Sequence, residues 1–252
     1  MSDLAQAVSV RSFAGRLVRM PLRLIPKDAV VPVLSGGLRG ARWVVGSGIH
    51  GCWLGIYEAD KQRRFAEFVR PGMTVFDIGA HVGFYTLLSS RLVGPEGRVF
   101  AFEPNPRNLP RLERHVALNK AVNTTVMPCA VAEARGEMGF ELAPALSTDS
   151  GYMGRISEGG SVRVRVECLD QLLDEGAIVP ADLVKIDVEG AERLVLEGGR
   201  RFFTSRKPTI FLATHGEEVH RECCELLASW GYALSSLDEG KDLAHCREVL
   251  AR

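Results

Sequence analysis

Short apolar runs alternate with segments of helical periodicity over most of the chain. Runs typical of strands buried on both faces occur at residues 74–79, 98–103, 124–131, 182–188 and 208–214. Apolar residues at helical spacing occur at residues 84–93, 107–119, 169–174, 191–203 and 217–230. This alternation predicts an α/β fold, in which a doubly wound sheet binds its ligand at the carboxyl ends of the strands.

Two further pairs of segments do not fit the parallel core. Residues 137–142 and 162–167 alternate polar and apolar positions around a loop rich in Ser and Gly, which is typical of a hairpin. We therefore expect an inserted β-hairpin at about residues 137–168, acting as a lid or specificity element. Near the end of the chain, residues 233–237 and 246–250 are expected to add a closing antiparallel pair.

The first 57 residues differ in charge from the remainder. They hold seven basic residues against two acidic ones, whereas the whole chain is neutral, with 31 basic and 31 acidic residues. We interpret residues 1–57 as a basic and apolar extension with a lead-in, and residues 58–252 as the main domain. Residues 10–24 form a basic amphipathic segment, for which we favour a docked or partly ordered extension. A transit-like presequence and a peripheral contact with an anionic membrane surface are the alternatives.

The composition narrows the class of protein further. Balanced charge argues against a dedicated duplex-binding protein, whose affinity would come mostly from neutralising phosphates. The six cysteines lack the spacing of a disulfide framework or a zinc site, so a reducing cytoplasm is the expected compartment. No uninterrupted apolar run reaches 18 residues, and no membrane-spanning segment is expected.

The loop after the first predicted strand carries the strongest chemical signal. It reads DIGAHVG (77–83), where Gly79 and Gly83 allow close approach of a ligand and the following helix N-terminus can receive an anionic group. Glu103 ends the second strand and is placed to accept hydrogen bonds from both hydroxyls of a ribose. The leading acid, Asp77, suits a ligand that also carries an amine. S-adenosylmethionine combines an amino-acid group, a ribose and an adenine.

Three segments resemble the FkbM-type methyltransferases, a class I family that depends on S-adenosylmethionine. They are WLGIYE (53–58), VFDIGAHVGFYTLLSSRLVGPEGRVFAFEPNPRN (75–108) and LVKIDVEGAERLVLEGG (183–199). The resemblance implies a Rossmann-like fold with a mostly parallel seven-stranded sheet and helices on both faces. It also implies S-adenosylmethionine as cofactor, S-adenosylhomocysteine as product, and methyl transfer usually to a hydroxyl of a sugar or natural product.

By position, the resemblance also implies which residues bind the cofactor. These are Glu58, Asp77, Gly79, Ala80, Gly83, Phe84, Glu103, Pro104, Asn105 and Ala130. The glycine-loop residues would line the methionine part and Glu103 would hold the ribose. Ala130 would lie near the adenine, and Glu58 near the amino end of the cofactor.

The methyl acceptor is expected at the carboxyl ends of the fourth and fifth predicted strands, near Asp187, Glu189 and His215. A histidine titrates near neutrality, so His215 is the predicted general base for a hydroxyl nucleophile, and Asp187 is predicted to orient the acceptor or the cofactor. Glu189 and Glu192 begin the next helix, where carboxylates complement the helix dipole. No metal is expected, because Asp187 and His215 alone are too few ligands.

Two positions in the predicted strands are unusual. Lys185 is a charged residue in an apolar strand, and Ala213 departs from the family pattern. Lys185 lies inside an apolar strand, where a charge is costly unless it is paired, so we expect an ion pair with Asp187 or Asp77. Many FkbM-type members end the fifth strand with Glu-x-His, whereas this chain reads ATH (213–215). Any role of that missing acid is therefore open in this protein.

The leading hypothesis is O-methylation of a sugar, glycan or natural product that depends on S-adenosylmethionine. The expected partner is a small-molecule or glycan acceptor. An RNA methyltransferase and a cofactor-binding module without turnover are the alternatives, although the neutral charge makes nucleic acid a poor partner.

Overall fold

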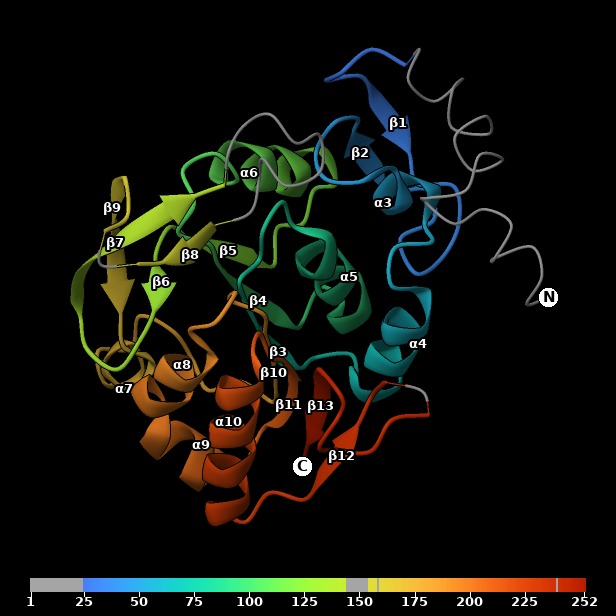
Figure 1. Cartoon of the computed structure of the whole chain (residues 1–252). Helices are drawn as coiled ribbons and strands as arrows, with labels where there is room; N and C mark the ends of the chain where they lie inside the picture. The colour runs from blue at the N-terminus through green and yellow to red at the C-terminus, as the bar shows by residue number, and fades with distance from the viewer. Residues whose placement is uncertain (1–24, 144–153, 158, 239) are drawn as a thin grey trace.

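The computed structural model describes residues 25–143, 154–157, 159–238 and 240–252 (Figure 1). Its centre is a seven-stranded sheet in the order β12-β13-β11-β10-β3-β4-β5. The strands are β3 (Thr74–Ile78), β4 (Arg98–Phe102), β5 (Thr124–Met127), β10 (Leu183–Ile186), β11 (Thr209–Ala213), β12 (Leu234–Ser236) and β13 (Glu248–Ala251). β13 pairs antiparallel with β11 and with β12, and the other neighbouring strands of this sheet pair in parallel. The predicted mostly parallel sheet with a closing antiparallel pair is confirmed.

Helices cover both faces of this sheet (Figure 1). One face carries α4 (Ala59–Phe68), α5 (Phe84–Val93) and α6 (Leu109–Leu118), and the other carries α7 (Leu169–Asp174), α8 (Glu192–Gly198), α9 (Arg200–Arg206) and α10 (Glu217–Ser229). Side chains alternate along a strand. Val75 of β3 therefore packs in the core on the side of α5, while Phe76 and Ile78 pack on the side of α7, α8, α9 and α10.

One predicted helix is in fact two. Residues 191–203 were expected to form a single helix, but Gly199 separates α8 from α9. A Cβ at Gly199 would lie 2.7 Å from the ring of Phe203. The chain therefore needs glycine where it turns between the two short helices.

The insert is larger than the predicted hairpin. It is a four-stranded sheet in the order β6-β9-β7-β8 (left of Figure 1), made of β6 (Ala130–Val131), β7 (Gly136–Leu142), β8 (Gly154–Ile156) and β9 (Val162–Glu167). The expected antiparallel pairing of the two alternating segments is present as β7 and β9. The predicted strand 124–131 divides around Pro128, which has no N–H to donate to a ladder. Residues 144–153 and 158 of the predicted loop lie outside the described residues.

The segment before α4 packs on the same core as α5. It forms β1 (Val30–Pro32), β2 (Arg42–Val44) and α3 (His50–Leu54). Trp43 is fully buried and stacks on His115 of α6 at 4.0 Å. His115 accepts from the backbone N–H of Val44 and donates to the carbonyl of Val82 in the glycine loop. This segment therefore supports the loop.

The predicted basic segment at residues 10–24 lies outside the described residues. Within the described part of the chain, no helix has both the length and the apolar character needed to cross a membrane.

Candidate active site

A cavity of about 380 Å³ opens at the carboxyl ends of the central strands. The parallel strands β3, β4, β10 and β11 all end there, because their crossover helices return the chain to the opposite edge. Ten of the twelve predicted site residues line it: Glu58, Gly79, Ala80, Phe84, Glu103, Pro104, Asn105, Ala130, Asp187 and His215. Asp77 and Gly83 do not line it.

The glycine loop is shaped by close packing. Gly79 has φ 82°, and a Cβ there would overlap the carbonyl oxygen of Asp187. Gly83 has φ 95°, directly before α5, and a Cβ would lie 2.7 Å from Leu112. Both positions require glycine, and Gly83 fixes the start of the helix without reaching the cavity.

Asp77 has a supporting position, not the predicted one facing a cofactor amine. It is buried beneath the loop, where it accepts a 2.6 Å hydrogen bond from Thr86 and lies 3.3 Å from Nζ of Lys185. Lys185 also lies 3.6 Å from Asp187, so the predicted pairing of this lysine is confirmed with both acids. Burial alone would lower the pKa of Lys185, but Asp77 and Asp187 reverse the shift and raise it. Lys185 therefore holds two strand ends together as a cation.

Glu103 is buried and lines the cavity. One carboxylate oxygen accepts from the backbone N–H of His81 at 2.7 Å, and the other accepts from Asn105 N at 2.8 Å and Asn108 Nδ2 at 3.1 Å. Burial raises the pKa of Glu103 to about 7, against the lowering effect of these N–H groups. A carboxylate has about four acceptor positions, and three of them are used here, so one position, on the oxygen that accepts from His81, remains for a hydroxyl donor from a ligand.

The raised pKa of Glu103 predicts that ribose binding depends on pH. Adenosine is a suitable probe, because it carries the ribose without the titrating amine of the cofactor. A ribose hydroxyl donates to the ionised carboxylate, so binding is accompanied by proton release below pH 7. We expect the dissociation constant, measured by calorimetry, to rise roughly tenfold between pH 8 and pH 6. A flat profile over this interval would contradict the assignment of Glu103 to the ribose.

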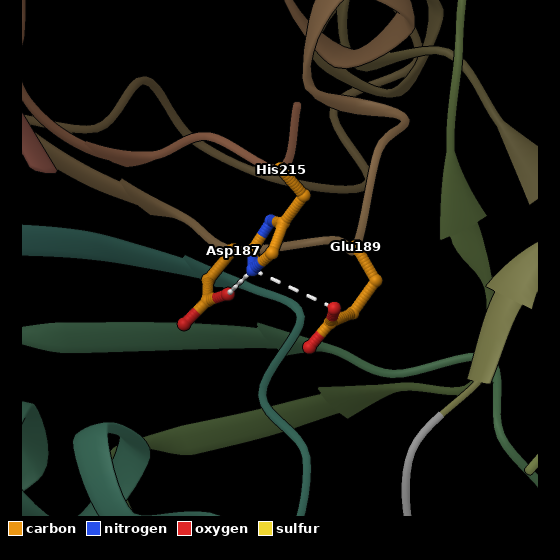
Figure 2. A group of neighbouring side chains, drawn as sticks. All are labelled: Asp187, Glu189 and His215. Atoms are coloured by element: carbon orange, nitrogen blue, oxygen red, sulfur yellow. Dashed lines mark ion pairs between the residues drawn. The ribbon is translucent and has the colours of Figure 1, made fainter. Parts of the chain in front are cut away.

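Three side chains that line the cavity meet beside the ends of β10 and β11 (Figure 2), and we call this part the far end of the cavity. Asp187 follows β10, Glu189 lies in the loop before α8, and His215 follows β11. Nε2 of His215 lies 3.8 Å from Asp187 and 3.5 Å from Glu189. The parallel pairing of β10 with β11 places their ends together, as expected from the sequence for Asp187 and His215.

Glu192 accepts a hydrogen bond from the His215 ring on the side away from Asp187 and Glu189, and so fixes the orientation of the ring. The Glu192 side chain is fully buried, and its Oε1 accepts from His215 Nδ1 at 2.8 Å and from the backbone N–H of Gly190 at 3.0 Å. The hydrogen bond to Glu192 raises the pKa of His215; burial opposes this, and Glu189 and Asp187 add to it. With Nδ1 donating to Glu192, Nε2 is directed toward Asp187 and Glu189.

Several residues of the cavity wall were not singled out from the sequence. They come from the lead-in, the small sheet and the last strand: Gly48, Ile49, Cys52, Phe140, Gly154, Ile156 and Glu248. Their sequence surroundings carry no chemical signal, because only the tertiary fold brings them to the cavity. Glu58 also lines the wall, and it accepts a 2.9 Å hydrogen bond from Tyr85.

The strand order, with its single antiparallel strand next to the edge, and the cavity at the strand ends define a class I methyltransferase fold, in which S-adenosylmethionine is the cofactor. The family described as "Methyltransferase FkbM domain" matches residues 77–234. The chain belongs to the FkbM family of S-adenosylmethionine-dependent methyltransferases. The family, fold class and cofactor expected from the sequence are confirmed.

Curated relatives share part of their length with this chain. The hexuronic acid methyltransferase AglP of Haloferax volcanii is 29% identical over 143 residues, covering 56% of this chain and 56% of that protein. The 31-O-demethyl-FK506 methyltransferase FkbM of Streptomyces tacrolimicus is 31% identical over 159 residues, covering 52% and 60%. The chain thus spans less than two thirds of the length of these relatives.

Solved structures share the fold. The FkbM methyltransferase of Methylobacillus flagellatus has a TM-score of 0.50 and 17% identity, covering 76% of this chain and 50% of that one. A putative rRNA methylase of Clostridium thermocellum also has a TM-score of 0.50, with 14% identity, covering 76% and 90%. At these identities the likeness concerns the fold only.

Proposed function

We propose that this protein transfers a methyl group from S-adenosylmethionine to a hydroxyl of a sugar, glycan or natural product. The observation that carries the proposal is the sharing of one cavity by Glu103, suited to a ribose, and by Asp187 and His215, suited to a hydroxyl. Relatives named for a hexuronic acid and for 31-O-demethyl-FK506 support this acceptor class. The cytoplasm is the compartment we propose, since all six cysteines are unpaired.

The residues of the cavity fit the proposed cofactor. When bound, the cofactor supplies an electrophilic methyl group on a positively charged sulfur. Glu103 would hold the ribose, and Gly79 and Ala80 would border the methionine part. Glu58 would lie near its amino end. Ala130, on the wall contributed by the small sheet, would border the adenine.

A second and more open hollow joins the main cavity at Glu189 and His215, where we propose that the acceptor binds. It lies between the small sheet and the helices α8 and α10, and it shares Gly154, Ile156, Glu189, Ala191 and His215 with the main cavity. An acceptor entering by this hollow would reach His215 without crossing the cofactor part. This supports a specificity role for the small sheet.

The acceptor hydroxyl must lose its proton as it is methylated, and we propose that Asp187 and His215 promote that loss. Positioning alone supplies much of the catalysis of an in-line displacement, and a group acting on the proton adds typically 10²–10⁴-fold. The first test is calorimetry with S-adenosylhomocysteine, for which we expect one site of micromolar affinity. A screen of sugars and glycosylated metabolites, read by S-adenosylhomocysteine release, then identifies the acceptor. No binding of S-adenosylhomocysteine or S-adenosylmethionine would refute the proposal.

Replacing His215 by asparagine separates turnover from cofactor binding. The asparagine amide can still donate to Glu192 in place of Nδ1, while the group corresponding to Nε2 is lost. We expect turnover to fall at least ~10²-fold and S-adenosylhomocysteine affinity to stay within about twofold. Full turnover in His215→Asn, measured with the acceptor found in the screen, would show that His215 does not act on the acceptor.

A further inference from the structure

Three potential metal ligands converge at the acceptor end of the cavity. One ligand atom each from Asp187, Glu189 and His215 lies within 4.8 Å of the other two (Figure 2). Two ligands that bind one ion at about 2.1–2.3 Å lie roughly 3–4.5 Å apart. The distances of 3.5 Å and 3.8 Å from His215 Nε2 to the two carboxylates fall within this interval. The sequence pointed to two of these ligands, and the fold adds Glu189.

The spacing differs from that of a hydrogen-bonded ion pair. An imidazole N–H that donates to a carboxylate normally approaches to about 2.7–2.9 Å. Nδ1 of His215 does so at 2.8 Å from Glu192. Nε2 of the same ring stays 3.5 Å or more from Asp187 and Glu189. The three potential ligand atoms, His215 Nε2 and one carboxylate oxygen each from Asp187 and Glu189, are therefore separated by enough space for an ion.

Glu192 gives His215 the arrangement that metal-binding histidines commonly have. Histidine ligands usually donate their second ring N–H to a carboxylate, which fixes the tautomer and increases the basicity of the ligating nitrogen. Glu192 is fully buried and makes this contact. Its other oxygen, Oε2, is buried without a hydrogen-bond partner in the described part of the chain. A fully buried carboxylate of this kind favours additional positive charge beside the imidazole.

The cavity and its immediate surroundings also carry excess negative charge. Seven carboxylates lie in or directly behind the wall: Glu58, Asp77, Glu103, Asp187, Glu189, Glu192 and Glu248. The lysines paired with this group are Lys61 and Lys185. S-adenosylmethionine, with a sulfonium, an ammonium and a carboxylate, adds only one net positive charge. A divalent cation at the far end would reduce the remaining excess.

We propose that Asp187, Glu189 and His215 bind a divalent cation of the Mn²⁺ or Mg²⁺ class. Two carboxylate oxygens and one imidazole nitrogen suit Mn²⁺, and three protein ligands leave positions open for water and an acceptor hydroxyl. The role at the acceptor rests on the proposed function. The cation would lower the pKa of the acceptor hydroxyl, whose proton would pass to water as the oxygen takes the methyl group from the sulfonium. Under this proposal His215 is a ligand, and it replaces the general-base role expected from the sequence.

The test is a Mn²⁺ titration of the chelator-treated full chain, followed by the electron paramagnetic resonance signal of free Mn²⁺. We expect one site per chain with a dissociation constant below about 100 μM at neutral pH. Asp187→Asn, Glu189→Gln and His215→Asn should each weaken binding at least tenfold. Glu192→Gln, at a positioning residue, should weaken it about 10–100-fold. The matched control is Glu218→Gln on α10, an exposed carboxylate, which should leave Mn²⁺ binding unchanged.

Thermal unfolding and S-adenosylhomocysteine binding are measured on every variant. They distinguish loss of the cation site from loss of the folded structure. Glu189→Gln alters a side chain that is one-third exposed and keeps the test decisive if a more buried variant fails to fold. Absence of Mn²⁺ binding at millimolar concentration, with and without S-adenosylhomocysteine, would overturn the proposal. Binding that Glu189→Gln and His215→Asn leave unchanged would overturn it equally. S-adenosylhomocysteine titration tests the proposed function independently, because a protein that binds Mn²⁺ but neither form of the cofactor keeps the cation site and loses the methyltransferase proposal.

Discussion

Replacing Glu103 by glutamine is expected to weaken S-adenosylhomocysteine binding by about 10²-fold at pH 8. At that pH the carboxylate is mainly ionised, since its pKa is about 7. Hydrogen bonds to a charged acceptor contribute about 1.5–3 kcal/mol each, and each 1.4 kcal/mol corresponds to a tenfold change in affinity. One ribose hydroxyl that donates to the remaining acceptor position, with an energy at the upper end of this range, therefore accounts for an effect of about this size. Calorimetry at 25 °C measures it directly.

The control for Glu103→Gln is Glu113→Gln, an exposed glutamate on α6, which should bind S-adenosylhomocysteine as the wild type does. Thermal unfolding of the variant is needed as well, because the introduced amide group would meet backbone N–H groups that now donate to the carboxylate. An affinity within about threefold of wild type, in a protein with unchanged unfolding temperature, would show that Glu103 does not bind the ribose.

The parts of the fold that sequence could predict are those set by local pattern. The central strands, such as β3 and β10, are short apolar runs, and the position of Glu103 follows from the strand before it. The small sheet was predicted only in part. Its parallel pairing of Ala130 with Val166 joins residues that are distant in sequence, and no local pattern specifies such a pair. The division at Gly199 likewise depends in part on a distant residue, because Leu169 packs against this glycine together with Phe203.

Prediction from the sequence is limited in the same way for single side chains of the candidate site. An acid near the end of a strand gives the same sequence signal whether it faces a ligand or a buried lysine. The register of β3 with β10 places Lys185 directly beside Asp77, and register is not visible in the chain. Glu192 was interpreted as a helix-dipole residue because its partner His215 lies 23 positions away. Contacts between strand ends had to come from the structure.

Two glycines with nearly the same φ angle allow the role of the glycine loop to be measured. Gly79 has φ 82° and Gly72 has φ 83°. A Cβ at Gly72 would meet nothing within 4 Å, whereas a Cβ at Gly79 would overlap the carbonyl oxygen of Asp187. Alanine at either position therefore incurs the cost of a positive φ angle, about 1–2 kcal/mol. Only Gly79→Ala also forces two strand ends apart.

We expect Gly79→Ala to lower the free energy of unfolding by about 3 kcal/mol or more, because steric overlap adds to the conformational cost. Gly72→Ala should lose only the conformational part and bind S-adenosylhomocysteine normally. Since the overlap involves Asp187, any folded fraction of Gly79→Ala should also lose S-adenosylhomocysteine and Mn²⁺ binding together. Urea unfolding followed by circular dichroism gives the difference between the two variants. Equal free energies of unfolding for the two variants would mean that the ends of β3 and β10 can separate at little cost, which is incompatible with a cavity wall held rigid by this contact.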